Sequence, residues 1–416
     1  MIHPLLILVA LSGCVPLDLD DDPDAYISSL RYRRGILERD LEYGDNTYGE
    51  RRWENYGVRR SDWERLPERD LATLPLTPAA YAAAVQGNLE FDEATASSLV
   101  PDRVPATDAQ WLALGERVFF EYPLRADPMW TAVVGIPGAL EQVGAIQHPD
   151  GSFVGLRVLQ VGSEVAIGQT CASCHAGDGL GEVSGSLSNR WLDVGQVSLL
   201  AGTVEPLLEL DTTSREHLAD LGPGRNDVLG DGEFNPYAFA DFGGIADIPR
   251  LQHNGNWQNR SIATLAVRCE TLFLTSSGQR TRIPRVLSWA LARYLRSLPP
   301  PPPVDEPSES SSRGESIFEG RCARCHTPPL YTSDRVVPLD EIGTDPSAAL
   351  SPSRTSPGYR IPSLRGVGWT APYLHHGVFA DLEEMFDPER EEPGHEFGLD
   401  LDEAERADLL AFLRTL

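Results

Sequence analysis

The chain has 416 residues and is strongly acidic, with 62 Asp and Glu against 35 Arg and Lys and a formal net charge of −27 at pH 7. This length is enough for two or three domains, each with a core of its own. The acidity argues against a nucleic-acid partner, which selects for a basic surface, and it suits a positively charged protein partner.

The first 14 residues predict export. They contain a short apolar run that ends in Leu-Ser-Gly-Cys, and they resemble a bacterial lipoprotein signal peptide that is cleaved before Cys14. The run is much shorter than the ~20 apolar residues that a membrane-spanning helix needs. We therefore expect a protein on the periplasmic side of a bacterial membrane, held by a lipid on Cys14, with the outer membrane as its expected location.

Residues 15–105 form a charged lead segment that we expect to be partly disordered. A first domain is predicted to follow over residues 106–298. It begins with a helical pattern at residues 111–120 and closes on an amphipathic helix at residues 284–298. Between these helices, the alternating apolar pattern of residues 153–161 predicts a strand.

A linker over residues 299–312 separates the two halves of the chain. Five consecutive prolines make its start stiff and extended, and the serines that follow make its end flexible. Residues 313–416 are then predicted to form a second domain, which closes on a helix at residues 402–416. Acidic side chains cluster at the start of that helix, as the helix dipole favours.

Each of the two domains contains one Cys-x-x-Cys-His peptide, the attachment motif of c-type haem. The two copies supply Cys171, Cys174 and His175, and Cys322, Cys325 and His326. In such a peptide both thiols bind the haem, and the histidine is the proximal ligand of the iron. The copies begin 151 positions apart, at residues 171 and 322, too far for the ~15–20-residue spacing of a zinc ribbon, and a thioredoxin-like pair would not explain both histidines. The sequence therefore predicts a di-haem cytochrome with two haem c groups.

The segment from Tyr359 to Gly377 resembles the C-terminal signature of bacterial di-haem cytochrome c peroxidases. Their superfamily also includes the MauG-type oxidases and the di-haem rubber oxygenases. The likeness is specific over residues 313–416, weaker over residues 106–298 and absent from the lead segment. It implies a mainly α fold of two cytochrome c-like domains packed around two covalently bound haems, with a little β structure in the first domain.

The resemblance also implies roles for individual parts of the chain. The N-terminal haem would react with peroxide or oxygen, and the C-terminal haem would relay electrons. Trp257 would assist transfer between the haems, with a purely structural buried aromatic residue as the alternative. Thr370 and Pro372 match positions that contribute to a calcium site in several members of the superfamily.

The axial ligands decide whether a haem relays electrons or reacts, because only an open sixth position admits oxygen or peroxide. For the C-terminal haem we expect His395, in Gly-His-Glu-Phe-Gly, as the sixth ligand, and Met385 is the alternative. For the N-terminal haem, His253 is a candidate for a ligand, a distal proton relay or a plain loop residue. Glu270 is a candidate acid–base group for peroxide cleavage.

Taken together, these patterns predict an exported di-haem c-type cytochrome that acts as a peroxidase-like or oxygenase-like oxidoreductase. Its expected partners are peroxide or oxygen and a small redox protein that donates or accepts electrons. The alternative is a non-catalytic di-haem electron-transfer protein in which both irons are six-coordinate, because the resemblance alone does not establish an activity.

Overall fold

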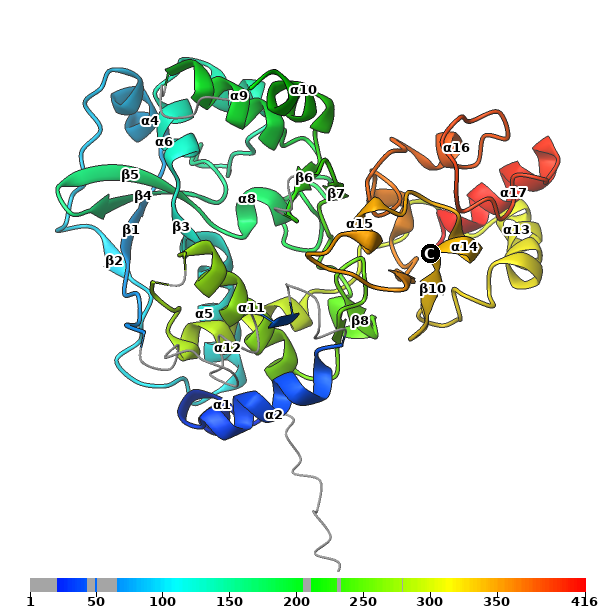
Figure 1. Cartoon of the computed structure of the whole chain (residues 1–416), viewed down its shortest axis with the longest axis horizontal. Helices are drawn as coiled ribbons and strands as arrows, with labels where there is room; N and C mark the ends of the chain where they lie inside the picture. The colour runs from blue at the N-terminus through cyan, green and yellow to red at the C-terminus, as the bar shows by residue number, and fades with distance from the viewer. Residues whose placement is uncertain (1–20, 43–48, 51–65, 205–210, 230–232, 279) are drawn as a thin grey trace, which may run out of the picture.

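A larger body, built from the chain up to the linker, lies beside a smaller C-terminal body (Figure 1). The computed structural model describes residues 21–416 except 43–48, 51–65, 205–210, 230–232 and 279. In these described ranges no helix is both long enough and apolar enough to cross a membrane. Cys14 and the expected signal peptide lie outside them.

The larger body is mainly helical. Its helices are α1 (Pro23–Ser28), α2 (Leu30–Asp40), α4 (Pro78–Val85), α5 (Asp108–Glu121), α6 (Pro128–Val134), α7 (Ala139–Gln142), α8 (Ala172–His175), α9 (Val194–Val204), α10 (Thr212–Leu221), α11 (Ile262–Ser276) and α12 (Arg285–Ser297), with the 3₁₀ turn η2 (Ile245–Asp247). Its strands are β1 (Ala72–Pro75), β2 (Ser97–Ser98), β3 (Arg125–Ala126), β4 (Leu156–Val161), β5 (Glu164–Gln169), β6 (Arg225–Asp227), β7 (Pro236–Ala238), β8 (Arg250–Leu251) and β9 (Trp257–Gln258). The helices predicted at residues 111–120 and 284–298 are confirmed as α5 and α12, and the predicted strand is confirmed as β4.

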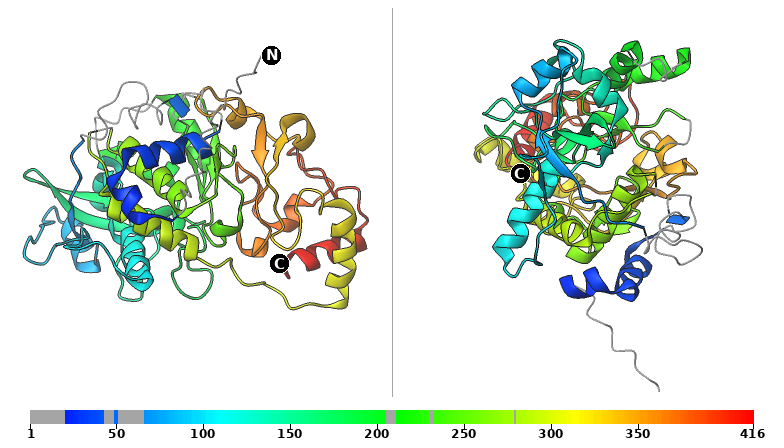
Figure 2. Two further views of the ribbon diagram at one scale, coloured as in Figure 1. Left: turned by 90° about the horizontal axis from the view of Figure 1, so that it is seen from below. Right: turned by 90° about the vertical axis from the view of Figure 1, so that its left-hand side faces the viewer.

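An antiparallel sheet in the order β2-β1-β4-β5-β3 runs through the larger body and is seen from two further directions in Figure 2. β4 and β5 form a hairpin, and β1 pairs with β4 so that Leu74 lies opposite Val158. Leu76, directly after β1, is fully buried among the apolar side chains that pack on this sheet. The boundary expected at residue 105 therefore does not separate two units, because the lead segment contributes β1 and β2 to the same sheet.

The start of the lead segment packs on the larger body. α1 and α2 lie against α11 and α12 at the bottom of Figure 1. Tyr26, Ile36 and Leu37 are fully buried there, and the ring centroids of Tyr26 and Trp289 are 5.3 Å apart. This part of the lead segment is thus folded, whereas the expectation of partial disorder falls in part on residues outside the described ranges.

Both bodies contain a pair of helices that cross at a glycine. α5 packs against α12 in the larger body, and α13 (Glu309–Arg321) packs against α17 (Glu403–Leu413) in the smaller one. A Cβ atom at Gly115 would collide with the carbonyl oxygen of Ala290, and one at Gly314 would collide with that of Asp408. Because glycine has no Cβ atom, the two backbones at each crossing can touch. The repeated arrangement supports two related domains.

The smaller body is formed around α13 and α17. Its other elements are α14 (Leu339–Ile342), α15 (Ser347–Leu350), α16 (Leu382–Met385), the 3₁₀ turn η3 (Val367–Trp369) and a hairpin of β10 (Val336–Pro338) and β11 (Gly358–Arg360). The helix predicted at residues 402–416 is confirmed as α17. It begins at Asp402, whose side chain forms a capping box with Glu405.

The linker is held to both bodies along its length. Its hydrogen bonds run from the Ser186 hydroxyl to the Pro299 carbonyl oxygen (3.0 Å), from the Trp369 indole to the Pro302 carbonyl oxygen (2.8 Å) and from the Val304 N–H to the Arg414 carbonyl oxygen (2.9 Å). The flexible end that the serines predict is not observed. Ser308 caps α13, so residues 309–312 form the first turn of that helix.

Candidate functional site

The two Cys-x-x-Cys-His peptides lie in different bodies, the first on α8 and the second directly after α13. None of their four thiols forms a disulfide, and burial raises the pKa values of Cys174 and Cys322 to about 11. In the described ranges no three His, Cys, Asp or Glu side chains are grouped to hold a metal ion. The two pairs therefore do not meet in a shared zinc site there, and burial keeps the thiols of Cys174 and Cys322 neutral at pH 7.

Both proximal histidines are oriented by a backbone carbonyl. The Nδ1 atom of His175 lies 2.8 Å from the carbonyl oxygen of Ala240, and that of His326 lies 3.1 Å from the carbonyl oxygen of Tyr331. Burial lowers the pKa of His175 to about 4, which keeps the imidazole neutral at pH 7. A carbonyl that accepts the Nδ1 proton fixes the tautomer in which Nε2 is free to bind a metal. Both residues thus fit the role of a haem ligand.

A cavity of about 270 Å³ lies beside the second attachment peptide and is lined by both bodies. The smaller body contributes Cys322, Cys325, His326, Met385, Phe386 and His395. The larger body contributes Phe239, Asp241, Ile245, Ile248 and His253. A mainly apolar space next to two thiols and an oriented imidazole fits a covalently attached porphyrin.

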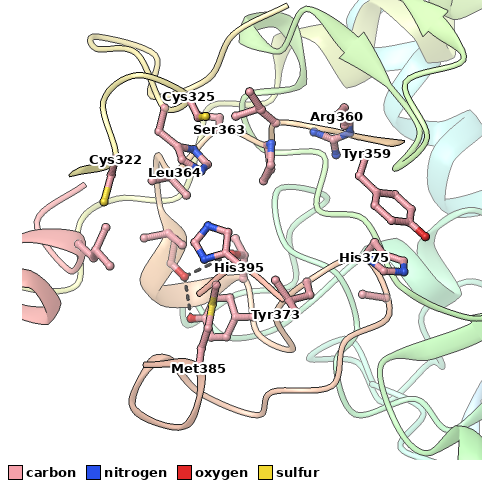
Figure 3. Close-up of a pocket in the computed structure, with 18 of the residues that line it drawn as sticks. Cys322, Cys325, Tyr359, Arg360, Ser363, Leu364, Tyr373, His375, Met385 and His395 are labelled. Atoms are coloured by element: carbon pink, nitrogen blue, oxygen red, sulfur yellow. Dashed lines mark hydrogen bonds between the residues drawn. The ribbon is translucent and has the colours of Figure 1, made fainter. Parts of the chain in front are cut away.

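His395 points into this cavity between Cys322 and Met385 (Figure 3). The ring centroids of His395 and His326 are 6.4 Å apart. An imidazole whose nitrogen binds a metal at about 2 Å has its centre roughly 3 Å from that metal, so two imidazoles on opposite sides of one iron lie roughly 6 Å apart. Burial lowers the pKa of His395 to about 4, and its buried Nδ1 has no hydrogen-bond partner among the described residues.

The glycine before His395 determines where this side chain lies. Gly394 has a φ of +94°, and a Cβ atom there would collide with the backbone of Thr344. We expect Gly394→Ala to displace His395 and to convert much of the second haem from the low-spin to the high-spin form, as measured by absorption spectroscopy. Gly320→Ala is the control, because a Cβ atom at that position of α13 meets nothing within 4 Å. An unchanged spectrum of the Gly394 variant would show that the close approach does not position the histidine.

His175 has different neighbours from His326. Its ring stacks on that of Phe242, with centroids 4.4 Å apart, and the ring of Phe239 packs at 6.2 Å. Phenylalanine has no atom that can bind iron. Among the described residues, the ring contacts of His175 are therefore with apolar side chains, whereas His326 has a second imidazole across the cavity.

Trp257 and His253 lie in different surroundings, although only four positions separate them. Trp257 is fully buried in the core of the larger body, on β9, and does not line the cavity. His253 lines the cavity beside the second attachment peptide, with its Nε2 atom 3.3 Å from the carbonyl oxygen of Ala238. The turn from β8 to β9 brings His253 against the smaller body, where its carbonyl oxygen accepts the N–H of Arg360 at 2.8 Å. His253 thus lies beside the second attachment peptide, and a role at the first haem stays a prediction.

Glu270 lies in the core of the larger body. It is fully buried on α11, where one carboxylate oxygen lies 3.0 Å from Arg285 Nε and the other accepts the Tyr26 hydroxyl at 2.9 Å. Both oxygens are thus engaged in the contact between α1, α11 and α12. The carboxylate therefore joins three helices inside the core, and its role in peroxide cleavage stays a prediction.

A group of polar side chains, which the sequence patterns did not reveal, lies at the side of the cavity that faces the larger body. The rings of Tyr359 and His375 stack with centroids 3.9 Å apart, and His376 stacks on His375 at 4.4 Å. Arg360 follows Tyr359 on β11 and also lines the cavity (Figure 3). The signature segment supplies all four residues, but only their arrangement in space distinguishes Arg360 from the other basic residues of the chain.

No family model matches the chain. It is 30% identical over 120 residues to the methylamine utilization protein MauG of Methylorubrum extorquens, in a match that covers 26% of this chain and 34% of that protein. The MauG of Methylophilus methylotrophus is 24% identical over 278 residues, or 60% of this chain and 76% of that protein. These matches support the resemblance of the chain to the superfamily of di-haem cytochrome c peroxidases and MauG.

The similarity to these proteins implies two c-type haems. A solved MauG-like protein associated with microbial copper homeostasis matches 76% of this chain and 91% of that chain, with 18% identity and a TM-score of 0.36. The di-haem peroxidase BthA of Burkholderia thailandensis matches 84% of this chain and 95% of that chain, with 17% identity and a TM-score of 0.33.

Proposed function

We propose that the protein is an exported, peroxidase-like di-haem oxidoreductase. The haem of the first attachment peptide is the reactive one, and the haem of the second peptide relays electrons. The observation that carries this proposal is the contrast between His326, which faces His395, and His175, which is packed by phenylalanine rings. A haem with two strong protein ligands transfers electrons, whereas one with an open sixth position reacts with small molecules.

The residues of the chain orient the ligands and exclude water. The carbonyl groups of Ala240 and Tyr331 accept the Nδ1 protons of the two proximal histidines and so raise the basicity of their Nε2 atoms. Phe239 and Phe242 shield His175 with apolar surface. When bound, haem c supplies one-electron redox chemistry at its iron and, where the sixth position is open, reaction with peroxide or oxygen.

Carbon monoxide binding tests this division of roles, because carbon monoxide binds a ferrous haem only where the sixth position is open or weakly ligated. In the reduced protein with both haems attached, we expect about one haem per chain to change its absorption bands. Peroxide-dependent oxidation of a reduced small redox protein should then be measurable. If neither haem responds, both irons are six-coordinate, and the protein is a non-catalytic electron carrier instead.

Partner, location and calcium are further parts of the proposal. The net charge of −27 supports a basic redox protein as the electron donor or acceptor. The periplasmic location and the lipid on Cys14 rest on the N-terminal sequence. A calcium ion near Thr370 and Pro372 stays a prediction, and its support is that both residues line the cavity between the two bodies.

A further inference from the structure

Four arginines line the cavity beside the second attachment peptide, and Asp241 supplies the one carboxylate among the described residues that line it. Three of these arginines form ion pairs: Arg321 with Asp400 (2.6 Å), Arg324 with Glu341 (3.6 Å) and Arg365 with Asp247 (2.5 Å). The fourth, Arg360, pairs with no acidic side chain in the described ranges. An arginine without an acidic partner is unusual in a chain that has 62 acidic residues.

The guanidinium group of Arg360 needs a negatively charged partner. Its Nε and Nη1 atoms are buried and have no hydrogen-bond partner among the described residues. Burial lowers the pKa of Arg360 to about 10, so the group is still positively charged at neutral pH. The carboxylate of Asp241 is engaged elsewhere, because it accepts the N–H of Ser188 at 2.7 Å. A buried charge without a partner is strongly unfavourable, which indicates that an anion completes this site.

The backbone holds Arg360 at the side of the cavity away from the cysteines. β11 pairs with β10, which places Arg360 opposite Val336, and the Arg360 N–H donates to the His253 carbonyl oxygen. In Figure 3, Cys322 and Arg360 lie on opposite sides of His395. Haem c carries its two thioether bonds at one edge and its two propionate groups at the opposite edge. A haem attached at the cysteines and bound by His395 would therefore extend its propionates toward Arg360.

We propose that Arg360 binds a propionate of the haem attached to Cys322 and Cys325 and raises the reduction potential of that haem. This inference rests on the proposed di-haem function. A nearby positive charge disfavours ferric iron, which carries one more positive charge than ferrous iron. At roughly 10 Å and an effective dielectric constant of about 20, one unit charge changes the ferrous-to-ferric ratio on the order of tenfold.

The experiment compares the reduction potentials of the C-terminal haem in the full-length protein and in three variants by spectroelectrochemistry. Arg360→Gln should favour the ferric state by about tenfold, which is a potential about 59 mV lower for a one-electron couple. Arg360→Lys keeps the charge and should show less than half of this shift. Arg313→Gln is the matched control for net charge, because Arg313 is exposed on α13 and pairs with Asp408. The ferrous-to-ferric ratio of this control variant should stay within twofold of that of the unmodified protein.

Haem content and added phosphate separate the possible results. If Arg360→Gln carries two haems and has the potential of the Arg313 control, the inference about Arg360 is wrong and the proposed function is unaffected. If the unmodified protein carries no haem on the second peptide, both proposals are wrong. If inorganic phosphate shifts the potential of the unmodified protein but not that of Arg360→Gln, the site binds an external anion and the propionate assignment is overturned. If Arg360→Gln loses the haem, the Arg360→Lys variant decides the question. A ferrous-to-ferric ratio that falls by the full tenfold in the lysine variant, despite the retained charge, contradicts the ion pair.

Discussion

Replacing His395 with alanine is expected to raise the number of carbon monoxide-binding haems from about one to about two per chain. The two imidazoles of His326 and His395 lie 6.4 Å apart, a separation that suits one iron between them. Alanine has no atom that could bind this iron, so the sixth position of the C-terminal haem would open. Absorption spectra of the reduced variant, with and without carbon monoxide, measure the change directly. Electron relay to the first haem should slow at the same time, because the iron changes its spin state.

Met385 provides the matched control for this experiment. It is 8% exposed and lines the same cavity, and it was the alternative ligand expected from the sequence. Met385→Leu keeps a similar volume and should leave carbon monoxide binding at about one haem per chain. If the leucine variant gains a binding site and the alanine variant at His395 does not, Met385 is the sixth ligand and the proposed assignment is wrong.

Replacing Glu270 with glutamine is expected to lower the free energy of unfolding by about 3–5 kcal/mol. The substitution keeps the size of the side chain but removes the negative charge that faces Arg285, so a buried positive charge loses its carboxylate. Denaturant unfolding followed by circular dichroism measures this loss. The peroxide turnover of the fraction that remains folded should be unchanged, because both carboxylate oxygens of Glu270 are engaged in the contact between α1, α11 and α12.

A double variant distinguishes this structural role from a catalytic one. Glu270→Leu combined with Arg285→Met removes both charges and should recover most of the lost stability, because an apolar pair of similar volume often replaces a buried ion pair at little cost. Turnover should again follow the amount of folded protein. A double variant that is as stable as the unmodified protein but inactive would restore Glu270 as an acid–base group.

The haem attachment residues could be predicted because covalent chemistry requires a fixed spacing along the chain. The same is true of α5, α12 and α17, since the periodicity of their apolar residues is a local property. The environment of Glu270 could not be predicted in this way. Its partner Tyr26 is 244 positions away in a segment that resembles a charged tether, and only folding brings the two side chains together.

His253 and Arg360 illustrate the same limit at the cavity. His253 is a candidate at the first haem because it precedes Trp257 by four positions, but the short turn between β8 and β9 directs the two side chains to different places. Arg360 stands out only when the ion pairs of the neighbouring arginines are known. In both cases the decisive information is a tertiary contact, and sequence periodicity carries no signal for such a contact.

The linker holds the two bodies at a fixed separation. Ser186 holds its start on the larger body, and Trp369 and Arg414 hold its later part on the smaller one. The distance between two haems bound by these bodies would therefore be fixed by the linker and its hydrogen bonds, without a docking motion. Because electron tunnelling slows steeply with distance, transfer between the centres should proceed at one characteristic rate. Lengthening the linker would then change the rate of electron transfer between the two centres before it changed the free energy of unfolding.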